Sequence, residues 1–269
     1  MIPAAFAYER AGSVEEAIEL LGRDEDAKVL AGGHSLIPAM KLRIARPSML
    51  VDIGRLHDLR YVREHGDRIA IGALTRHSAL VRDPLLTSRC ALIAHATELV
   101  GDPQVRHRGT IGGSLAHADP ASDLGAVVLA LDAELVGRGP DGERTIPAAE
   151  FFTGPFTSVL GPQELLTEIR VPAVERGVYL KYQRSSRDWA TVGVAAADVG
   201  GRVQVGLASM GPTSLRASAV EEALASGASA SDAAAQAAEG TEPPSDVSAS
   251  SEYRAHLARV LVRRALEQL

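Results

Sequence analysis

The chain contains one cysteine, Cys90, among its 269 residues. A single thiol excludes an internal disulfide, and it excludes a metal or iron–sulfur cluster held by thiolates of this chain alone. The apolar run 91–94 that follows it suits an inert thiol, because a reactive thiolate needs an accessible, electropositive setting. The sequence therefore points away from thiol chemistry in this chain.

Excess basic charge, long apolar runs and hydrolytic signatures are also missing. The 28 Lys and Arg residues stand against 34 Asp and Glu, and the net charge of −6 argues against a nucleic-acid binder. No apolar run reaches the roughly 20 residues of a membrane span, and the first nine residues lack the basic-then-apolar order of a signal peptide. There is no Gly-x-Ser-x-Gly elbow, P-loop lysine or carboxylate cluster for a metal. We therefore expect a cytoplasmic protein without a self-contained hydrolytic site.

Two glycine pairs stand out instead, at positions 32–33 and 112–113. The first pair follows a short apolar run, and small hydroxyl residues (Ser35, Thr110 and Ser114) accompany the two pairs. Glycine allows a positive φ and lets backbone N–H groups approach a ligand with no Cβ in the way. We therefore expect two backbone anion nests that converge on one nucleotide pyrophosphate.

Each chemistry-bearing residue also has a purely structural explanation. A glycine pair after a strand is usually a tight turn, and His34 and His117 are more often loop residues than acid–base catalysts. Asp123 could accept hydrogen bonds from sugar or ribityl hydroxyls, or it could complement the positive end of a helix that begins near it. Trp189 and Lys181 are ambiguous between core packing and contact with a ligand ring. The residues alone leave these alternatives open.

The helical signals are distributed along the whole chain. Ser13 and Glu16 form a capping box that begins a helix ending at residue 22. The other helices are expected at 87–100, from Pro120 to Leu131, at 217–225, at 232–238 and from Tyr253 onward. Thr87 or Ser88 would begin the helix at 87–100, and Asp119 would cap the helix that follows it. The arginines of the last helix are expected to face solvent.

The strand signals complete an α+β pattern. Short strands are expected at 28–31, 48–53, 68–73, 133–136, 144–146 and 165–171. Three alternating runs, at 177–183, 190–199 and 202–210, predict an antiparallel meander. The glycine signals are thus confined to the first 125 residues, and a sheet-plus-helix module follows after about residue 176.

Four stretches together carry a family resemblance. They are Ala31–Pro38 (AGGHSLIP), Asp102–Arg106 (DPQVR), Thr110–Ser114 (TIGGS) and Asp119–Asp123 (DPASD). With them, the whole chain resembles the FAD-binding medium subunit of molybdenum hydroxylases, in particular the flavoproteins of carbon monoxide, aldehyde and xanthine dehydrogenases. The resemblance implies an α+β fold: a two-part FAD-binding fold of the vanillyl-alcohol-oxidase (PCMH) type, followed by a small CO-dehydrogenase flavoprotein C-terminal domain of antiparallel sheet and helices. It divides the chain into two FAD-binding subdomains, residues 1–57 and 58–175, and a C-terminal domain, residues 176–269.

The resemblance also implies which residues contact FAD. Residues 29–36 and 110–114 would enclose the pyrophosphate, and Asp123 would hold ribityl or ribose hydroxyls. The full set of expected contacts is Val29, Leu30, Ala31, Gly32, Gly33, His34, Ser35, Leu36, Val100, Gly101, Thr110, Ile111, Gly112, Gly113, Ser114, His117, Asp123, Leu166, Lys181 and Trp189. Ser114 stands where asparagine is frequent in the family. No metal ligand and no acid–base catalytic residue is expected.

The function implied by the resemblance is electron transfer. In such enzymes a large subunit with a molybdenum cofactor oxidises the substrate, and a small subunit with two [2Fe–2S] clusters relays electrons to FAD, which passes them to an acceptor. The single cysteine agrees with a chain that carries FAD alone. We therefore expect an FAD-dependent oxidoreductase subunit of a hetero-oligomer, a dimer of heterotrimers, in which the protein positions and tunes the cofactor.

Two other functions stay open from the sequence. One is a stand-alone flavoprotein oxidase or reductase of the same fold, in which His34 could bind flavin covalently. The other is a flavin-free binding or scaffold module whose turns merely imitate flavin loops.

Overall fold

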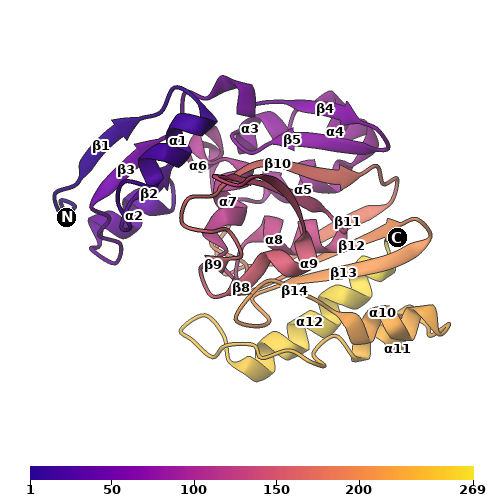
Figure 1. Cartoon of the computed structure of the whole chain (residues 1–269). Coiled ribbons are helices and arrows are strands. Elements are labelled where there is room, and N and C mark those ends of the chain that lie inside the picture. The colour runs from indigo at the N-terminus through magenta and orange to yellow at the C-terminus, as the bar shows by residue number, and fades with distance from the viewer.

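Two large sheets, a small parallel sheet and a two-stranded ribbon organise the chain (Figure 1). The computed structural model describes residues 1–269, the whole sequence. In Figure 1 the chain begins at the left in a small α/β unit, forms the central sheet, and ends below it in a second sheet covered by helices. None of the helices combines the length and hydrophobicity needed to cross a lipid bilayer.

The N-terminal unit is built on a parallel sheet with the strand order β1-β3-β2. Its elements are β1 (Ala7–Arg10), α1 (Val14–Leu21), β2 (Lys28–Leu30), α2 (Leu36–Lys41), β3 (Met49–Asp52) and the 3-10 helix η1 (His57–Leu59). Helix α1 begins as predicted, because the Ser13 hydroxyl accepts the backbone N–H of Glu16. Ala17, Leu20 and Leu21 of this helix pack in a separate N-terminal core.

The central sheet is antiparallel and has the order β4-β5-β10-β6-β7. Its strands are β4 (Val62–His65), β5 (Arg68–Gly72), β6 (Glu134–Gly139), β7 (Gly142–Pro147) and β10 (Leu165–Pro172). The helices of this part are α3 (His77–Leu80), α4 (Pro84–Arg89), α5 (Ala91–Glu98), α6 (Pro103–Arg108), α7 (Ile111–His117), α8 (Asp123–Ala130) and α9 (Ala148–Phe151). The ribbon is β8 (Phe152–Gly154) with β9 (Thr157–Ser158).

The C-terminal sheet is the predicted antiparallel meander, extended by a short fourth strand. Its strands are β11 (Gly177–Tyr182), β12 (Val192–Val199), β13 (Arg202–Ala208) and β14 (Leu215–Arg216). Helices α10 (Ser218–Ala225), α11 (Ala230–Ala235) and α12 (Ser251–Leu266) cover its lower face in Figure 1. Alternation along β12 directs Val192, Val194 and Ala196 toward these helices and Ala195 and Ala197 toward the central core.

Helix α8 lies between the two large sheets, and all eight of its residues are buried. It packs on α5 and α7 on one side and on β12 and β13 on the other. Small residues make this approach possible, because a Cβ atom on Gly206 of β13 would overlap the carbonyl oxygen of Ala126. The central sheet and the C-terminal sheet therefore share one core, which includes Leu124 of α8 and Ala195 of β12.

Predictions about two helices were wrong in detail. The expected helix at 87–100 is two helices that break at Cys90, and the first begins at a cap by Asp83 rather than at Thr87 or Ser88, because the Asp83 carboxylate accepts the N–H groups of Leu85 and Leu86. Helix α8 begins at Asp123 rather than at Pro120. The Asp119 side chain instead accepts the N–H of Ala121 within the preceding turn.

Two reactive or charged side chains, those of Cys90 and Arg254, are buried. Burial raises the pKa of the Cys90 thiol to about 12, which agrees with the inert thiol expected from the sequence. Arg254 of α12 does not face solvent: its side chain is 3% exposed, and it donates to the carbonyl of Thr191 and to Asp246 at 2.7 Å. A buried guanidinium needs such partners, and this one ties the last helix to the start of β12.

Candidate cofactor site

The first glycine pair forms an open loop at the carboxyl end of β2. Gly33 has a φ of 77°, which favours glycine. The backbone N–H groups of Gly32, Gly33, His34 and Ser35 donate no hydrogen bond within the chain. Ligands of open α/β sheets bind beyond the carboxyl ends of parallel strands. This loop therefore offers four unused donors at a position suited to an anion.

The second glycine pair is not an open nest, contrary to the sequence expectation. Gly112 and Gly113 lie in the first turn of α7, which Thr110 caps by accepting the N–H of Gly113 at 3.2 Å. The N–H groups of Ile111 and Gly112 donate to the carbonyls of Thr75 and Ala73, at 3.1 and 2.9 Å. A Cβ on Gly112 would lie 2.5 Å from the Cβ of Ala73. The glycine here serves close packing of α7 on the central sheet.

The two loops nevertheless lie against each other. A Cβ on Gly32 would overlap the carbonyl oxygen of Arg108, and one on Gly113 would lie 3.8 Å from the Cβ of Ala31. The first loop therefore seats directly on the segment that leads into α7. The structure thus brings residues 31–33 together with 110–113, as the sequence predicts.

A second group of expected residues meets at the start of α8. The carboxylate of Asp123 accepts a hydrogen bond from the Tyr179 hydroxyl at 2.5 Å and pairs with the Lys181 ammonium at 3.1 Å. Lys181 also donates to the carbonyl of Leu99 at 3.1 Å, which places it beside Val100. The Lys181 and Asp123 side chains are only 2% and 4% exposed. This contact joins β11 of the C-terminal sheet to α8 and to the end of α5.

Burial controls the protonation of this cluster. Burial raises the pKa of Asp123, and the Lys181 ammonium and the Tyr179 hydroxyl act in the opposite direction. Burial and the neighbouring carboxylate raise the pKa of Tyr179 well above its ordinary value, so this phenol stays a donor. Each carboxylate oxygen has two lone pairs, so Asp123 can still accept hydrogen bonds from a ligand hydroxyl.

Several other expected contacts are arranged around these two groups. The Ser114 and Ser122 hydroxyls lie 3.2 Å apart and connect α7 to the start of α8. Arg106 donates to the carbonyls of Val100 and Gly101 at 3.0 and 3.3 Å, and Gly101 has a φ of 51°.

The remaining expected contacts are less closely bound to the site. Leu166 of β10 is buried in the same core as Ile111. His117 packs against Phe156, with ring centroids 5.2 Å apart, and burial lowers its pKa. His34 and Trp189 are exposed, Trp189 by 57%.

Sequence reasoning missed two buried residues, Tyr179 and His77, that contact the expected site residues or the segment beside them. Tyr179 stands two residues before Lys181 on β11, and the period-two alternation of a strand was the available signal that both face Asp123. His77, the first residue of α3, is buried against Gly109, and burial lowers its pKa to about 4 with help from the nearby Arg106. No local pattern marks a histidine held in this way.

The arrangement fits a dinucleotide cofactor such as FAD. The four unused N–H donors of residues 32–35 suit a pyrophosphate, and the Thr110 and Ser114 hydroxyls border the neighbouring loop. Asp123 at the start of α8 and Lys181 of β11 supply a carboxylate and a cation. The fit comes from one open loop and one helix start, rather than from the two equivalent nests that the sequence suggested.

Comparison with known proteins identifies the family. Residues 4–174 match the family described as FAD binding domain in molybdopterin dehydrogenase, and residues 177–269 match the CO dehydrogenase flavoprotein C-terminal domain. The chain is 41% identical to the carbon monoxide dehydrogenase medium chain of Hydrogenophaga pseudoflava, over 99% of this chain and 97% of that relative. It is 36% identical to the glyceraldehyde dehydrogenase medium chain of Sulfolobus acidocaldarius, with 100% of both chains covered.

A solved structure agrees with these matches. Carbon monoxide dehydrogenase from Hydrogenophaga pseudoflava, in a form lacking the Mo-pyranopterin moiety of its molybdenum cofactor, has a TM-score of 0.96 to this chain. The identity is 43%, over 100% of this chain and 98% of that one. The expected α+β fold, an FAD-binding domain followed by a flavoprotein C-terminal domain, is therefore confirmed. The chain belongs to the FAD-binding medium subunits of the molybdenum hydroxylases, the oxidoreductase family that includes the carbon monoxide dehydrogenases.

Proposed function

We propose that this chain is the electron-transfer subunit of a molybdenum hydroxylase, and that it receives electrons from [2Fe–2S] clusters of a partner subunit and passes them through FAD to an external acceptor. The observation that carries the proposal is the open loop at residues 32–35, whose four backbone donors have no partner in the chain and lie against the start of α7. A pyrophosphate is the part of FAD that such a loop recognises.

The chain's own residues would bind and orient the cofactor. Residues 29–36 would hold the pyrophosphate on one side, and the Thr110 and Ser114 hydroxyls would hold it on the other. Asp123, fixed by Tyr179 and Lys181, would accept hydrogen bonds from ribityl or ribose hydroxyls. The remaining expected contacts (Val100, Gly101, Ile111, Gly112, Gly113, His117, Leu166 and Trp189) would line the site. Bound FAD supplies the capacity to accept and release electrons, which no side chain here provides.

The buried ion pair also has an electrostatic role in this proposal. Lys181 places a positive charge beside Asp123 in a water-poor region, where charges act more strongly than in solvent. The pair would keep the carboxylate an acceptor and hold β11 at a fixed position relative to α8. Pre-organisation of this kind lets a cofactor bind without rearranging the chain.

The proposed partners are a large subunit with a molybdenum cofactor and a small subunit with two [2Fe–2S] clusters, in a cytoplasmic dimer of heterotrimers. The names of the relatives support this assembly, because two of them are medium chains of dehydrogenases. We further propose that residues 1–57 and 58–175 form the two FAD-binding subdomains and that 176–269 form the C-terminal domain.

Flavin content and co-purification test the proposal. Protein isolated from its native host should be yellow and should release FAD into the supernatant on acid precipitation. It should also co-purify with one larger and one smaller subunit, which mass spectrometry would identify. A protein that stays colourless after addition of FAD would instead be a flavin-free module. A yellow pellet after precipitation would mean a covalent flavin, as in a stand-alone oxidase that uses His34.

A further inference from the structure

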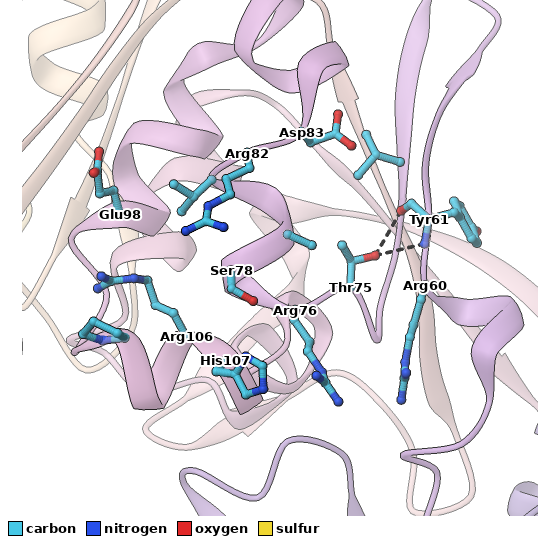
Figure 2. Close-up of a pocket in the computed structure, with 14 residues that line it drawn as sticks. Arg60, Tyr61, Thr75, Arg76, Ser78, Arg82, Asp83, Glu98, Arg106 and His107 are labelled. Carbon is cyan, nitrogen blue, oxygen red and sulfur yellow. Dashed lines mark hydrogen bonds between the residues drawn. The ribbon is translucent and has the colours of Figure 1, made fainter.

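A hollow in the surface lies beside the cofactor loops, and none of the residues expected to contact FAD lines it. It has a volume of about 790 Å3, within the range of small-molecule sites. The start of β4, helix α3 with the turn after it, and helix α6 form its walls (Figure 2). Its charged and hydroxyl-bearing lining consists of Arg60, Tyr61, Thr75, Arg76, Ser78, Arg82, Arg106 and His107 with Asp83 and Glu98.

The four arginines of this hollow outnumber its two carboxylates, Asp83 and Glu98. None of its four arginines forms an ion pair with a carboxylate. Asp83 is already committed to the N–H groups that begin α4, and Glu98 is exposed. Arg76 and Arg82 donate no hydrogen bond to any protein group, whereas Arg106 reaches two backbone carbonyls. The hollow therefore contains guanidinium N–H donors that no protein group accepts.

Arg60 is the one arginine of this hollow with a buried donor that lacks a hydrogen-bond partner. Its Nε is buried without a hydrogen-bond partner, although another nitrogen donates to the carbonyl of Gly54. Burial lowers the pKa of Arg60, and the positive charges of Arg76 and Arg108 lower it further. Figure 2 shows the Arg60 and Arg76 side chains extending in the same direction. Like charges gathered without a counter-ion are stabilised by a bound anion.

The lining indicates which anion fits. Guanidinium groups match the oxygens of a phosphate in paired hydrogen bonds, and they do so better than a point charge. Arg63 already lies over the Tyr61 ring, 4.4 Å from its centroid. Recognition by the arginines would therefore depend chiefly on the phosphate groups.

We propose that this hollow binds a phosphorylated small molecule with at least two negative charges, as a site separate from that of FAD. Arg60 and Arg76 also border a narrow space of about 40 Å3 beside Gly32 and Thr110. The proposed anion would thus lie next to the cofactor loops, close to Gly32 and Thr110. The proposal does not require the electron path described above.

Inorganic pyrophosphate, titrated calorimetrically into the FAD-loaded protein, tests this site. We expect saturable binding at one site per chain. Arg76→Gln combined with Arg82→Gln should weaken it at least tenfold, since each substitution removes charge-assisted hydrogen bonds. The FAD content of the Arg82→Gln single variant, whose side chain does not border the loop of Gly32 and Thr110, should equal that of the parent protein. Arg202→Gln combined with Arg264→Gln removes the same charge from exposed positions elsewhere and should leave the affinity unchanged.

Three results would overturn the proposal. Binding to FAD-free but not to FAD-loaded protein would mean that the hollow belongs to the phosphates of FAD itself. An affinity that survives the loss of Arg76 and Arg82 would place the anion elsewhere. No binding at all would leave these arginines as a surface for an acidic partner protein. FAD content, measured in the same samples, separates each of these failures from a failure of the proposed flavin function.

Discussion

Lys181 of β11 and Asp123 of α8 form an ion pair at 3.1 Å in which both side chains are almost completely buried. The pair links β11 of the C-terminal sheet to helix α8, and the Tyr179 hydroxyl donates to the same carboxylate. Charges removed from water in this way are stable only together, because each alone would keep its full desolvation cost.

Lys181→Met should therefore destabilise the protein strongly. The substitution leaves Asp123 buried with the Tyr179 hydroxyl as its one remaining side-chain donor, so we expect a loss of about 3 to 5 kcal/mol in the free energy of unfolding. Denaturant unfolding measures the loss. Arg263→Met is the matched control, since it breaks an exposed pair with Glu267 and should cost less than about 1 kcal/mol. Asp123→Asn added to Lys181→Met should recover part of the loss. Equally small losses in Lys181→Met and Arg263→Met would contradict the argument.

Gly33→Ala should release FAD. Gly33 has a φ of 77°, and a Cβ there would lie 2.7 Å from Cδ1 of Ile37, so the loop must change shape and its donors diverge. Gly200→Ala is the control, because that residue also has a positive φ, 61°, but lies in open space in the β12–β13 turn. Both variants should lose about 1 to 2 kcal/mol of stability. Flavin absorbance after gel filtration should fall in the first variant only, and equal retention would contradict the assignment of the loop.

His77 should make stability depend on pH. Its pKa is about 4 in the folded chain, against an ordinary value near 6.5, so the unfolded state takes up the proton first. Its contribution is therefore fully present above about pH 6.5 and is lost as the pH falls toward about 4. Between about pH 7.5 and about pH 5 the loss should be about 2 kcal/mol.

His77→Gln should remove this part of the acid sensitivity. The measurement is the free energy of unfolding of both proteins at the two pH values, so that the constant cost of the substitution cancels. An unchanged pH dependence in the variant would show that other groups cause it.

Gly206→Ala should loosen the packing of α8. A Cβ at this position overlaps the carbonyl oxygen of Ala126, which is backbone and cannot turn away. Overpacking of this kind costs about 1 to 3 kcal/mol. Gly154→Ala serves as the control, because the added methyl group there meets only ordinary contacts, with its closest neighbour at 3.8 Å. Thermal unfolding of the two variants compares the effects, and similar melting temperatures would refute this explanation of the helix–sheet contact.

The elements that the sequence predicts well are those whose signals are local. The capping box at Ser13 and the alternating runs of β11, β12 and β13 need only neighbouring residues, and the structure contains them with small shifts at their ends. The break at Cys90 was missed because the apolar pattern continues through it, whereas the Asp83 cap is the local feature that defines α4.

The site could be predicted in outline and not in its hydrogen bonds. The sequence correctly brings residues 31–33 to residues 110–113. It does not reveal that the N–H of Gly112 is taken by Ala73, since that bond depends on how α7 packs on β5. The partners of Asp123 lie 56 and 58 residues further on, so only the folded chain shows that its carboxylate is already held.

The position of α8 means that the two regions of this chain do not exist independently. All eight residues of this helix are buried, and the helix packs both on α5 and α7 and on β12 and β13. A protein cut after residue 176 would expose that second face to water and leave Asp123 without either of its side-chain donors. The C-terminal sheet thus completes the surroundings of Asp123 and α8, and residues 1–176 alone would lack them.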